Sequence, residues 1–146
     1  MLADSPDGFL LIIEGARIDM ASHSNDAERM LGELLAFAAA VARMSAWVDT
    51  RPDATLVVTA DHECGGLEVV EPAEAGVLSE VGWRWGLHTN TRIDLYAKGA
   101  GAEVFDGGVV DHRWVHALAS SRISNTRFVA PPPMNTPDGL LTDLQG

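Results

Sequence analysis

The stretch TLVVTADHECGGL, residues 55–67, decides the fold that the sequence predicts. Its first part, Thr55–Ala60, is a short apolar run rich in β-branched residues, which is typical of a strand buried on both faces in a parallel sheet. The chain turns polar directly after this run, at Asp61 and His62, and two glycines follow soon after. We therefore expect a buried strand whose carboxyl end carries a carboxylate and an imidazole.

A second run, GFLLIIE at residues 8–14, has the same form and also ends in a carboxylate. Between the two runs, apolar residues recur every three or four positions over about Ala27–Val48. This spacing predicts an amphipathic helix, with Asn25 or Asp26 as its N-cap. A strand–helix–strand order implies a right-handed parallel crossover. The predicted fold class is therefore α/β, with a mostly parallel sheet flanked by helices.

The remainder of the chain predicts fewer regular elements. Residues 67–87 contain one proline and three glycines, so we expect no long element there. Residues 91–97 alternate and predict a third strand, and a short helix is predicted over about Asp111–Ser120. We expect residues 1–129 to form the folded portion and the proline-rich residues 130–146 to form a flexible tail.

Composition excludes several classes of partner. The 146 residues include 21 Asp and Glu against 10 Lys and Arg, which gives a formal net charge of −11 without any basic cluster. Nucleic acids and anionic membranes are therefore not expected partners, because both are held by basic clusters. The apolar run at residues 9–13 is too short for a signal peptide or a membrane span. Cys64 is the single cysteine, cannot form an intrachain disulfide, and is interpreted as a small packed residue.

Three residues form one predicted metal-ligand set. Asp19 and His23 are four residues apart, so a helix would place both on one face. His88 precedes the third predicted strand and could join them. Three protein ligands with one open position are typical of catalytic zinc. Taken singly, each histidine is more often a surface residue, and His112 and His116, which share the same spacing, are interpreted as facing solvent.

Part of a second set follows the strand ends, where open α/β sheets bind their ligands. Asp61 and His62 are ligands that suit a second zinc, and the carboxylate of Glu14 suits magnesium, which prefers oxygen. Two cations about 4 Å apart can hold the attacking and leaving oxygens of a phosphoryl group. The ligand types thus favour phosphate-ester chemistry over redox chemistry.

Three segments resemble the alkaline phosphatase family. Residues 14–26 are similar to its EGxxIDxxxHxND signature, residues 56–67 to TLVVxTADHETGGL, and residues 88–101 to HTxxxVxVYAxGxGA. The likeness runs in order from about Gly8 to about Ala119. It implies a mostly parallel α/β domain that assembles as a homodimer in the periplasm or outside the cell. The implied reaction is hydrolysis of phosphomonoesters through a phosphoserine intermediate.

The resemblance also assigns the candidate ligands. Asp19, His23 and His88 would bind the first zinc, Asp61 and His62 the second, and Glu14 the magnesium. In the family, the serine nucleophile and the carboxylate that bridges the metals belong to the N-terminal half, which we cannot place in this sequence. We therefore expect no catalytic residue in this chain and little turnover by it alone.

Other interpretations of the same residues remain open. The chain could be a phosphodiesterase or mutase of the same metallo-phosphohydrolase superfamily, although its motifs disfavour this. It could also be an inactive zinc-binding remnant. A third alternative is a half-enzyme that completes its site with a separate N-terminal chain.

Overall fold

The computed structural model describes residues 4–132, which fall into two compact units. One unit is residues 13–104, and the described part of the other comprises residues 4–12 and 105–132. Residues 130–132 belong to no helix or strand, and residues 133–146 of the predicted tail lie outside the described residues. The predicted boundary between residues 129 and 130 therefore stays a prediction.

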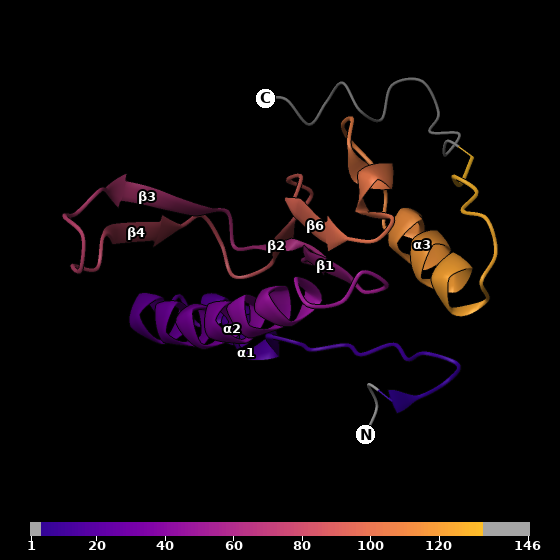
Figure 1. The fold of residues 1–146 in the computed structure, drawn as a ribbon. Helices are drawn as coiled ribbons and strands as arrows, with labels where there is room; N and C mark the ends of the chain where they lie inside the picture. The colour runs from indigo at the N-terminus through magenta and orange to yellow at the C-terminus, as the bar shows by residue number, and fades with distance from the viewer. Residues whose placement is uncertain (1–3, 133–146) are drawn as a thin grey trace. The chain divides into compact units, whose positions relative to one another are not determined.

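The unit of residues 13–104 mixes helices and short strands (Figure 1). Its helices are α1 (Ala16–His23) and α2 (Ala27–Val48). Its strands are β1 (Thr55–Thr59), β2 (Glu63–Cys64), β3 (Leu67–Glu71), β4 (Glu80–Trp83), β5 (His88–Thr89) and β6 (Leu95–Gly99). A short 3₁₀ helix, η2 (Ala102–Phe105), follows at the end of this unit.

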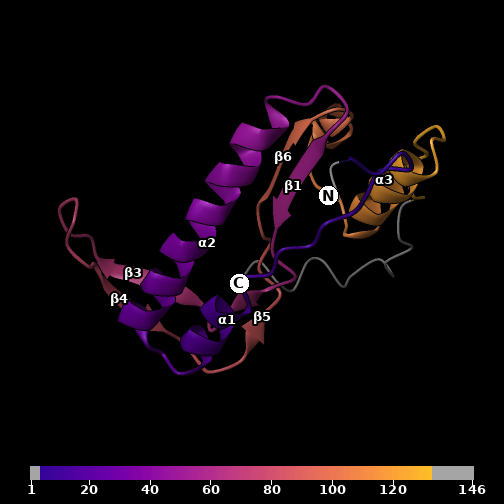
Figure 2. The ribbon, with the colours of Figure 1, turned by 60° about the horizontal axis from the view of Figure 1, so that its bottom comes forward.

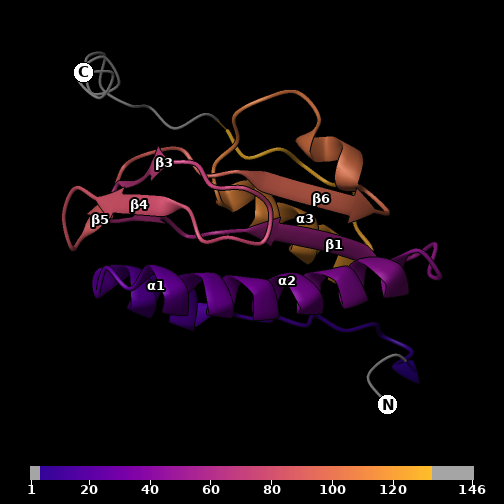
Figure 3. The same cartoon turned by 90° about the vertical axis from the view of Figure 1, so that its left-hand side faces the viewer.

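Helix α2 begins where the sequence predicts. The Asp26 carboxylate accepts a hydrogen bond from the Arg29 amide at 3.0 Å, which satisfies a backbone donor that the first turn leaves free. The helix ends at Val48, before the turn around Pro52. It packs against α1 on one side and runs along β1 and β6 on the other (Figures 2 and 3). The predicted amphipathic helix is thus confirmed.

Strand pairing differs from the prediction. Among the described residues every strand pair is antiparallel: β1 with β6, β2 with β5, and β3 with β4. Residues 8–14 form no strand, and the side chain of Ile12 is 79% exposed. The mostly parallel sheet is therefore not found in the described part of the chain. An apolar run predicts a strand that can be buried. Its composition does not specify which other strand it pairs with, or whether the pairing is parallel or antiparallel.

A hairpin occupies part of the segment that was expected to be irregular. Strands β3 and β4 pair with a shift in register between Val69 and Glu71, and the hairpin projects away from the β1–β6 pair (Figure 1). Pro72 directly follows β3, and Gly76, with φ of +90°, lies in the connection between the strands. No long element forms in this segment, as predicted, but it is not irregular, because the proline and the glycines lie at the ends of and between two short paired strands.

In the second unit, α3 (Arg113–Ile123) confirms the last predicted helix within a few residues at each end. Asp111 lies just before it and accepts hydrogen bonds from both the amide and the guanidinium of Arg113 at 2.9 Å. This pairing lowers the pKa of Asp111. The ring of Trp114, on this helix, lies 5.7 Å from the ring of Phe128 between centroids.

Few large side chains are buried in the described residues. The buried apolar residues are Ala21, Met30, Val48 and Leu118, whereas Leu35 on the outer side of α2 is 63% exposed. By length and composition α2 alone, among the described helices, could also cross a membrane. Core helices and signal sequences meet the same two criteria, and in this structure α2 packs on α1, β1 and β6.

Candidate metal centre

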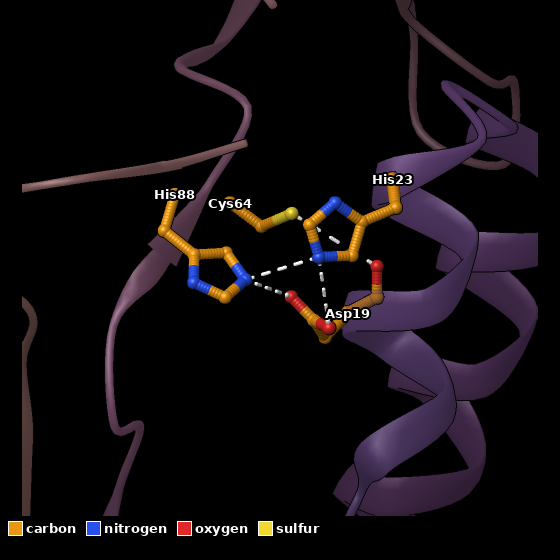
Figure 4. Close-up of side chains that lie close together, drawn as sticks. All are labelled: Asp19, His23, Cys64 and His88. Carbon is orange, nitrogen blue, oxygen red and sulfur yellow. Dashed lines mark hydrogen bonds and ion pairs between the residues drawn. The ribbon is translucent and has the colours of Figure 1, made fainter. Parts of the chain in front are cut away.

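Helix α1 presents an acid and an imidazole on one face. Asp19 and His23 are one turn apart, and Oδ2 of Asp19 lies 3.3 Å from Nε2 of His23. The helix ends directly after His23, where Asn25 adopts a left-handed backbone with φ of 53°. The predicted helical spacing is confirmed, and the two side chains point the same way (Figure 4).

The short β2–β5 ladder brings in a residue distant in the sequence. Cys64 of β2 stands opposite His88 of β5, so their side chains share one face of the ladder. Nε2 of His88 lies 3.0 Å from Nε2 of His23 and 3.4 Å from Oδ1 of Asp19. The three residues of the first predicted set therefore converge on one point between α1 and β5.

A backbone carbonyl fixes the proton on His23. Nδ1 of His23 lies 2.6 Å from the carbonyl oxygen of Gly86 and must donate to it, because a carbonyl can only accept. In the neutral ring Nε2 then carries a lone pair, which faces His88 and Asp19. Histidine ligands of metals commonly have this kind of outer hydrogen bond.

The donor atoms fit a divalent cation of zinc size. Donors about 2.0–2.2 Å from a tetrahedral ion lie roughly 3.3–3.6 Å from one another. The Nε2 atoms of His23 and His88 lie 3.0 Å apart, and each faces a different oxygen of the Asp19 carboxylate, at 3.3 and 3.4 Å. These separations are close to that edge length, although no single carboxylate oxygen makes both of them. Oδ1 of Asp19 is moreover a buried oxygen without a hydrogen-bond partner, and its ion-pair contact with His88 at 3.4 Å is charged only when that ring is protonated, so a bound cation would satisfy this oxygen. The residues present therefore fit such an ion.

The second predicted pair lies beside the first set. Nε2 of His62 is 3.1 Å from Oδ2 of Asp61, while Nδ1 of His62 is buried without a hydrogen-bond partner. The His62 ring stacks on His88, with 3.4 Å between centroids and 21° between planes. The Asp61 side chain is 86% exposed. The structure thus joins His62 to the first set through ring contact, and Asp61 contacts His62.

Glu14 lies elsewhere in the same unit. It lines a pocket of about 290 Å³ together with Phe37 and with Arg17 and Glu33, which form an ion pair at 3.1 Å. Among the described residues, no hydrogen bond or ion pair joins Glu14 to His23, His62 or His88. The structure does not bring Glu14 into contact with that group, and its role as a magnesium ligand stays a prediction.

Cys64 was interpreted as a packing residue, but its thiol belongs to the same cluster. The ligand atoms of Asp19, His23, Cys64 and His88 all lie within 4.8 Å of one another. Burial raises the pKa of the Cys64 thiol to about 12, assisted by a hydrogen bond to Asp19 and by the charges of Asp19 and Glu63. The sequence could not reveal this contact, because it depends on the pairing of β2 with β5.

Glu63 organises the turn that carries these residues. Its carboxylate accepts hydrogen bonds from the amides of Gly66 and Leu67, each at 3.1 Å, and from the hydroxyl of Thr89. Burial alone would raise the pKa of Glu63, but these hydrogen bonds outweigh it and the pKa is lowered. Gly65 has φ of +81°, and a Cβ there would lie 2.4 Å from the Trp83 ring. Glu63 thus ties β2 to β5, a role that the sequence alone did not indicate.

Comparison with known proteins identifies the family. Residues 1–75, just over half of the chain, match the family model described as alkaline phosphatase. The chain is 46% identical over 66 residues to the alkaline phosphatase of Schizosaccharomyces pombe, which covers 45% of this chain and 12% of that protein. It is 32% identical over 120 residues to the repressible alkaline phosphatase of Saccharomyces cerevisiae, covering 82% of this chain and 20% of that protein. The chain thus spans a fifth or less of the length of these two relatives.

The structure agrees with the sequence comparison. A variant of the TAB5 alkaline phosphatase, solved with Mg bound in its M3 site, superposes with a TM-score of 0.57 and 29% identity. The match covers 63% of this chain and 29% of that protein. The family model, the relatives and the fold all agree with the motifs that surround the Asp19, His23 and His88 cluster. This chain belongs to the alkaline phosphatase family.

Proposed function

We propose that this chain supplies the metal-ligating part of a phosphomonoester hydrolase site that binds two Zn²⁺ and one Mg²⁺. One observation carries the proposal: the Nε2 atoms of His23 and His88, from two distant segments, lie 3.0 Å apart, and each is 3.3–3.4 Å from one of the two Asp19 carboxylate oxygens. Asp61 and His62 are proposed for the second zinc and Glu14 for the magnesium. When bound, such cations would neutralise and polarise the oxygens of a phosphoryl group.

The residues of the chain itself hold and orient the site. The Gly86 carbonyl keeps the proton of His23 on Nδ1, so that Nε2 is available as a donor. The stacked rings of His62 and His88 restrict each other's rotation. The nucleophile, a serine that forms a phosphoserine in this family, would come from polypeptide outside this sequence, as a separate N-terminal half or a longer chain. Phosphomonoesters are the proposed substrates, and a homodimer in the periplasm or outside the cell is the proposed form and location.

Zinc titration tests the site. We expect His23→Ala and His88→Ala each to weaken zinc binding by about a hundredfold or more, since even the loss of an outer partner of a ligand costs about 10–100-fold. Isothermal titration calorimetry on the full chain measures this. His116→Ala is the matched control, because His116 lies on α3, where its ring contacts Ser120 at 3.4 Å, and it should bind zinc like the unaltered chain. Equal affinities in all four proteins would remove the ligand assignment.

A further inference from the structure

Cys64 shares one face of a strand pair with a predicted zinc ligand. In the β2–β5 ladder Cys64 is the direct partner of His88, and directly opposed side chains on one face have Cβ atoms about 4.5–5.5 Å apart. His88 in turn reaches Asp19 and His23 on α1. The sulfur atom, drawn in yellow in Figure 4, therefore lies at the edge of the same cluster.

The thiol is directed toward α1. Sγ of Cys64 lies 3.9 Å from the backbone carbonyl oxygen of Asp19, so the side chain reaches the residue that supplies the carboxylate. All four candidate ligand atoms, including this sulfur, lie within 4.8 Å of one another. A sulfur at about 2.3 Å and a nitrogen or oxygen at about 2.0–2.2 Å from one tetrahedral ion lie roughly 3.5–3.7 Å apart, so the ligand atoms would draw together by roughly 1 Å on binding.

The backbone around Cys64 is tightly held. Glu63 fixes the following turn through the amides of Gly66 and Leu67, and the Gly65 amide donates to the Leu87 carbonyl at 2.8 Å. These bonds hold the β2–β5 register on both sides of the Cys64–His88 pair. The thiol is consequently presented to the histidines by the fold rather than by a mobile loop.

We infer that Sγ of Cys64 is a fourth protein ligand of the cation held by Asp19, His23 and His88. On binding, the S–H bond of the thiol is replaced by a sulfur–metal bond, and the proton leaves to solvent. A set of two imidazoles, one carboxylate and one thiolate selects a softer divalent ion such as Zn²⁺ or Co²⁺ over Mg²⁺. This inference rests on the proposed function, since it concerns the same cation.

A fourth protein ligand changes what the site can do. Catalytic zinc keeps one position open, whereas four protein ligands are typical of closed structural sites. In this chain the thiolate would take the fourth position, and a phosphoryl oxygen would then bind as a fifth ligand or in place of the sulfur. The thiolate would therefore control access of the substrate to this ion.

Cobalt substitution distinguishes the two ligand sets. The full chain is titrated with Co²⁺ and compared with Cys64→Ser by absorption spectroscopy. We expect visible d–d bands in both proteins and an intense near-ultraviolet sulfur-to-cobalt band in the unaltered chain only. Because Cys64 is the single cysteine, such a band has one thiolate source. Cys64→Ser should also bind Co²⁺ at least about tenfold more weakly, in line with the cost of disturbing a ligand shell.

Each outcome decides between the proposals. Visible bands without the sulfur band in the unaltered chain would overturn the role of Cys64 while leaving the Asp19, His23 and His88 site intact. Absence of visible bands at any Co²⁺ concentration would show that the Asp19, His23 and His88 site does not bind the ion. The proposed function would then be wrong, and the role of Cys64 as a ligand would be wrong with it. Should Cys64→Ser fail to fold by circular dichroism, the spectrum of the unaltered chain still decides, because it requires no variant.

Discussion

Gly99 closes the end of β6 against the segment before β1. Its φ is +95°, and a Cβ at this position would lie 2.3 Å from the carbonyl oxygen of Ala54 and 2.9 Å from the Val48 side chain. The Ala100 amide donates to the same Ala54 oxygen at 2.9 Å, so the two backbones cannot separate without losing this bond. Glycine is required here by both conformation and space.

Two glycine substitutions should therefore have opposite effects. We expect Gly99→Ala to lower the free energy of unfolding by about 2 kcal/mol or more, because strain and a backbone clash combine. Gly32→Ala is the matched control: Gly32 lies within α2 with open space around it, and we expect a gain of about 0.5–1 kcal/mol from helix propensity. Urea unfolding of the three proteins measures both. Equal stability of Gly99→Ala and the unaltered chain would contradict the described backbone.

At the same scale, the sequence predicted the spacing of Asp19 and His23 better than it predicted contacts between distant segments. That spacing was predictable because it is a property of one helix, and the role of both residues as ligands stays a prediction. The contact of Cys64 with this pair was not recognisable, since it depends on a strand register between residues 24 positions apart in the chain. The spacing of residues within one helix can be inferred from the sequence, whereas the pairing of distant segments depends on how they pack.

Among the elements, the β2–β5 ladder depends on one carboxylate. Glu63 and Thr89 are direct partners in the register, and the Thr89 hydroxyl donates to the Glu63 carboxylate that also holds the following turn. Hydrogen bonds to a charged group contribute about 1.5–3 kcal/mol each. A two-residue ladder has little other support, so this contact should govern its stability.

Removal of the Thr89 hydroxyl should loosen the ladder. We expect Thr89→Val to lower the free energy of unfolding by about 1–3 kcal/mol and to weaken zinc binding, because His88 precedes Thr89 in β5. Thr89→Ser keeps the hydroxyl and should stay within about 1 kcal/mol of the unaltered chain. Urea unfolding and calorimetric zinc titration measure the two effects. If Thr89→Val and Thr89→Ser had the same stability and the same zinc affinity, the Thr89 hydroxyl would have no part in holding the site.

Helices were predicted more closely than sheets. The limits of α2 and the start of β1 agree with the sequence prediction, because a helix of 22 residues has a clear period and a recognisable cap at Asp26. The predicted parallel pairing of the strands was not found in the described residues. The pairing of β1 with β6, and the hairpin of β3 and β4, arise from contacts that short apolar runs do not encode.

For the whole molecule, exposed apolar surface is the main feature. Leu35 on α2 and Ile12 in the N-terminal segment are 63% and 79% exposed, and β3 is exposed along its length. The chain spans 12% and 20% of the two curated relatives described above. The consecutive residues Leu10–Ile13 are 43–79% exposed. We propose that in a complete enzyme further polypeptide covers this run, because contiguous exposed apolar residues commonly mark interfaces.

Catalysis should then require polypeptide beyond this chain. We expect the zinc-loaded chain alone to hydrolyse p-nitrophenyl phosphate no faster than the His88→Ala variant, since no nucleophile is assigned in it. Addition of a separately produced N-terminal half of an alkaline phosphatase should give zinc-dependent release of p-nitrophenol. Absorbance of the product measures both. Rapid zinc-dependent turnover by the chain alone would show that it carries its own nucleophile.

The stacked imidazoles of His62 and His88 give the centre one more property. Their ring centroids are 3.4 Å apart, and each ring belongs to a different one of the two proposed ligand sets. An ion that immobilises either ring also removes freedom from the other, so a second ion would find its ligand already ordered. Occupancy would then be cooperative, and partially loaded molecules would be scarce relative to empty and fully loaded ones.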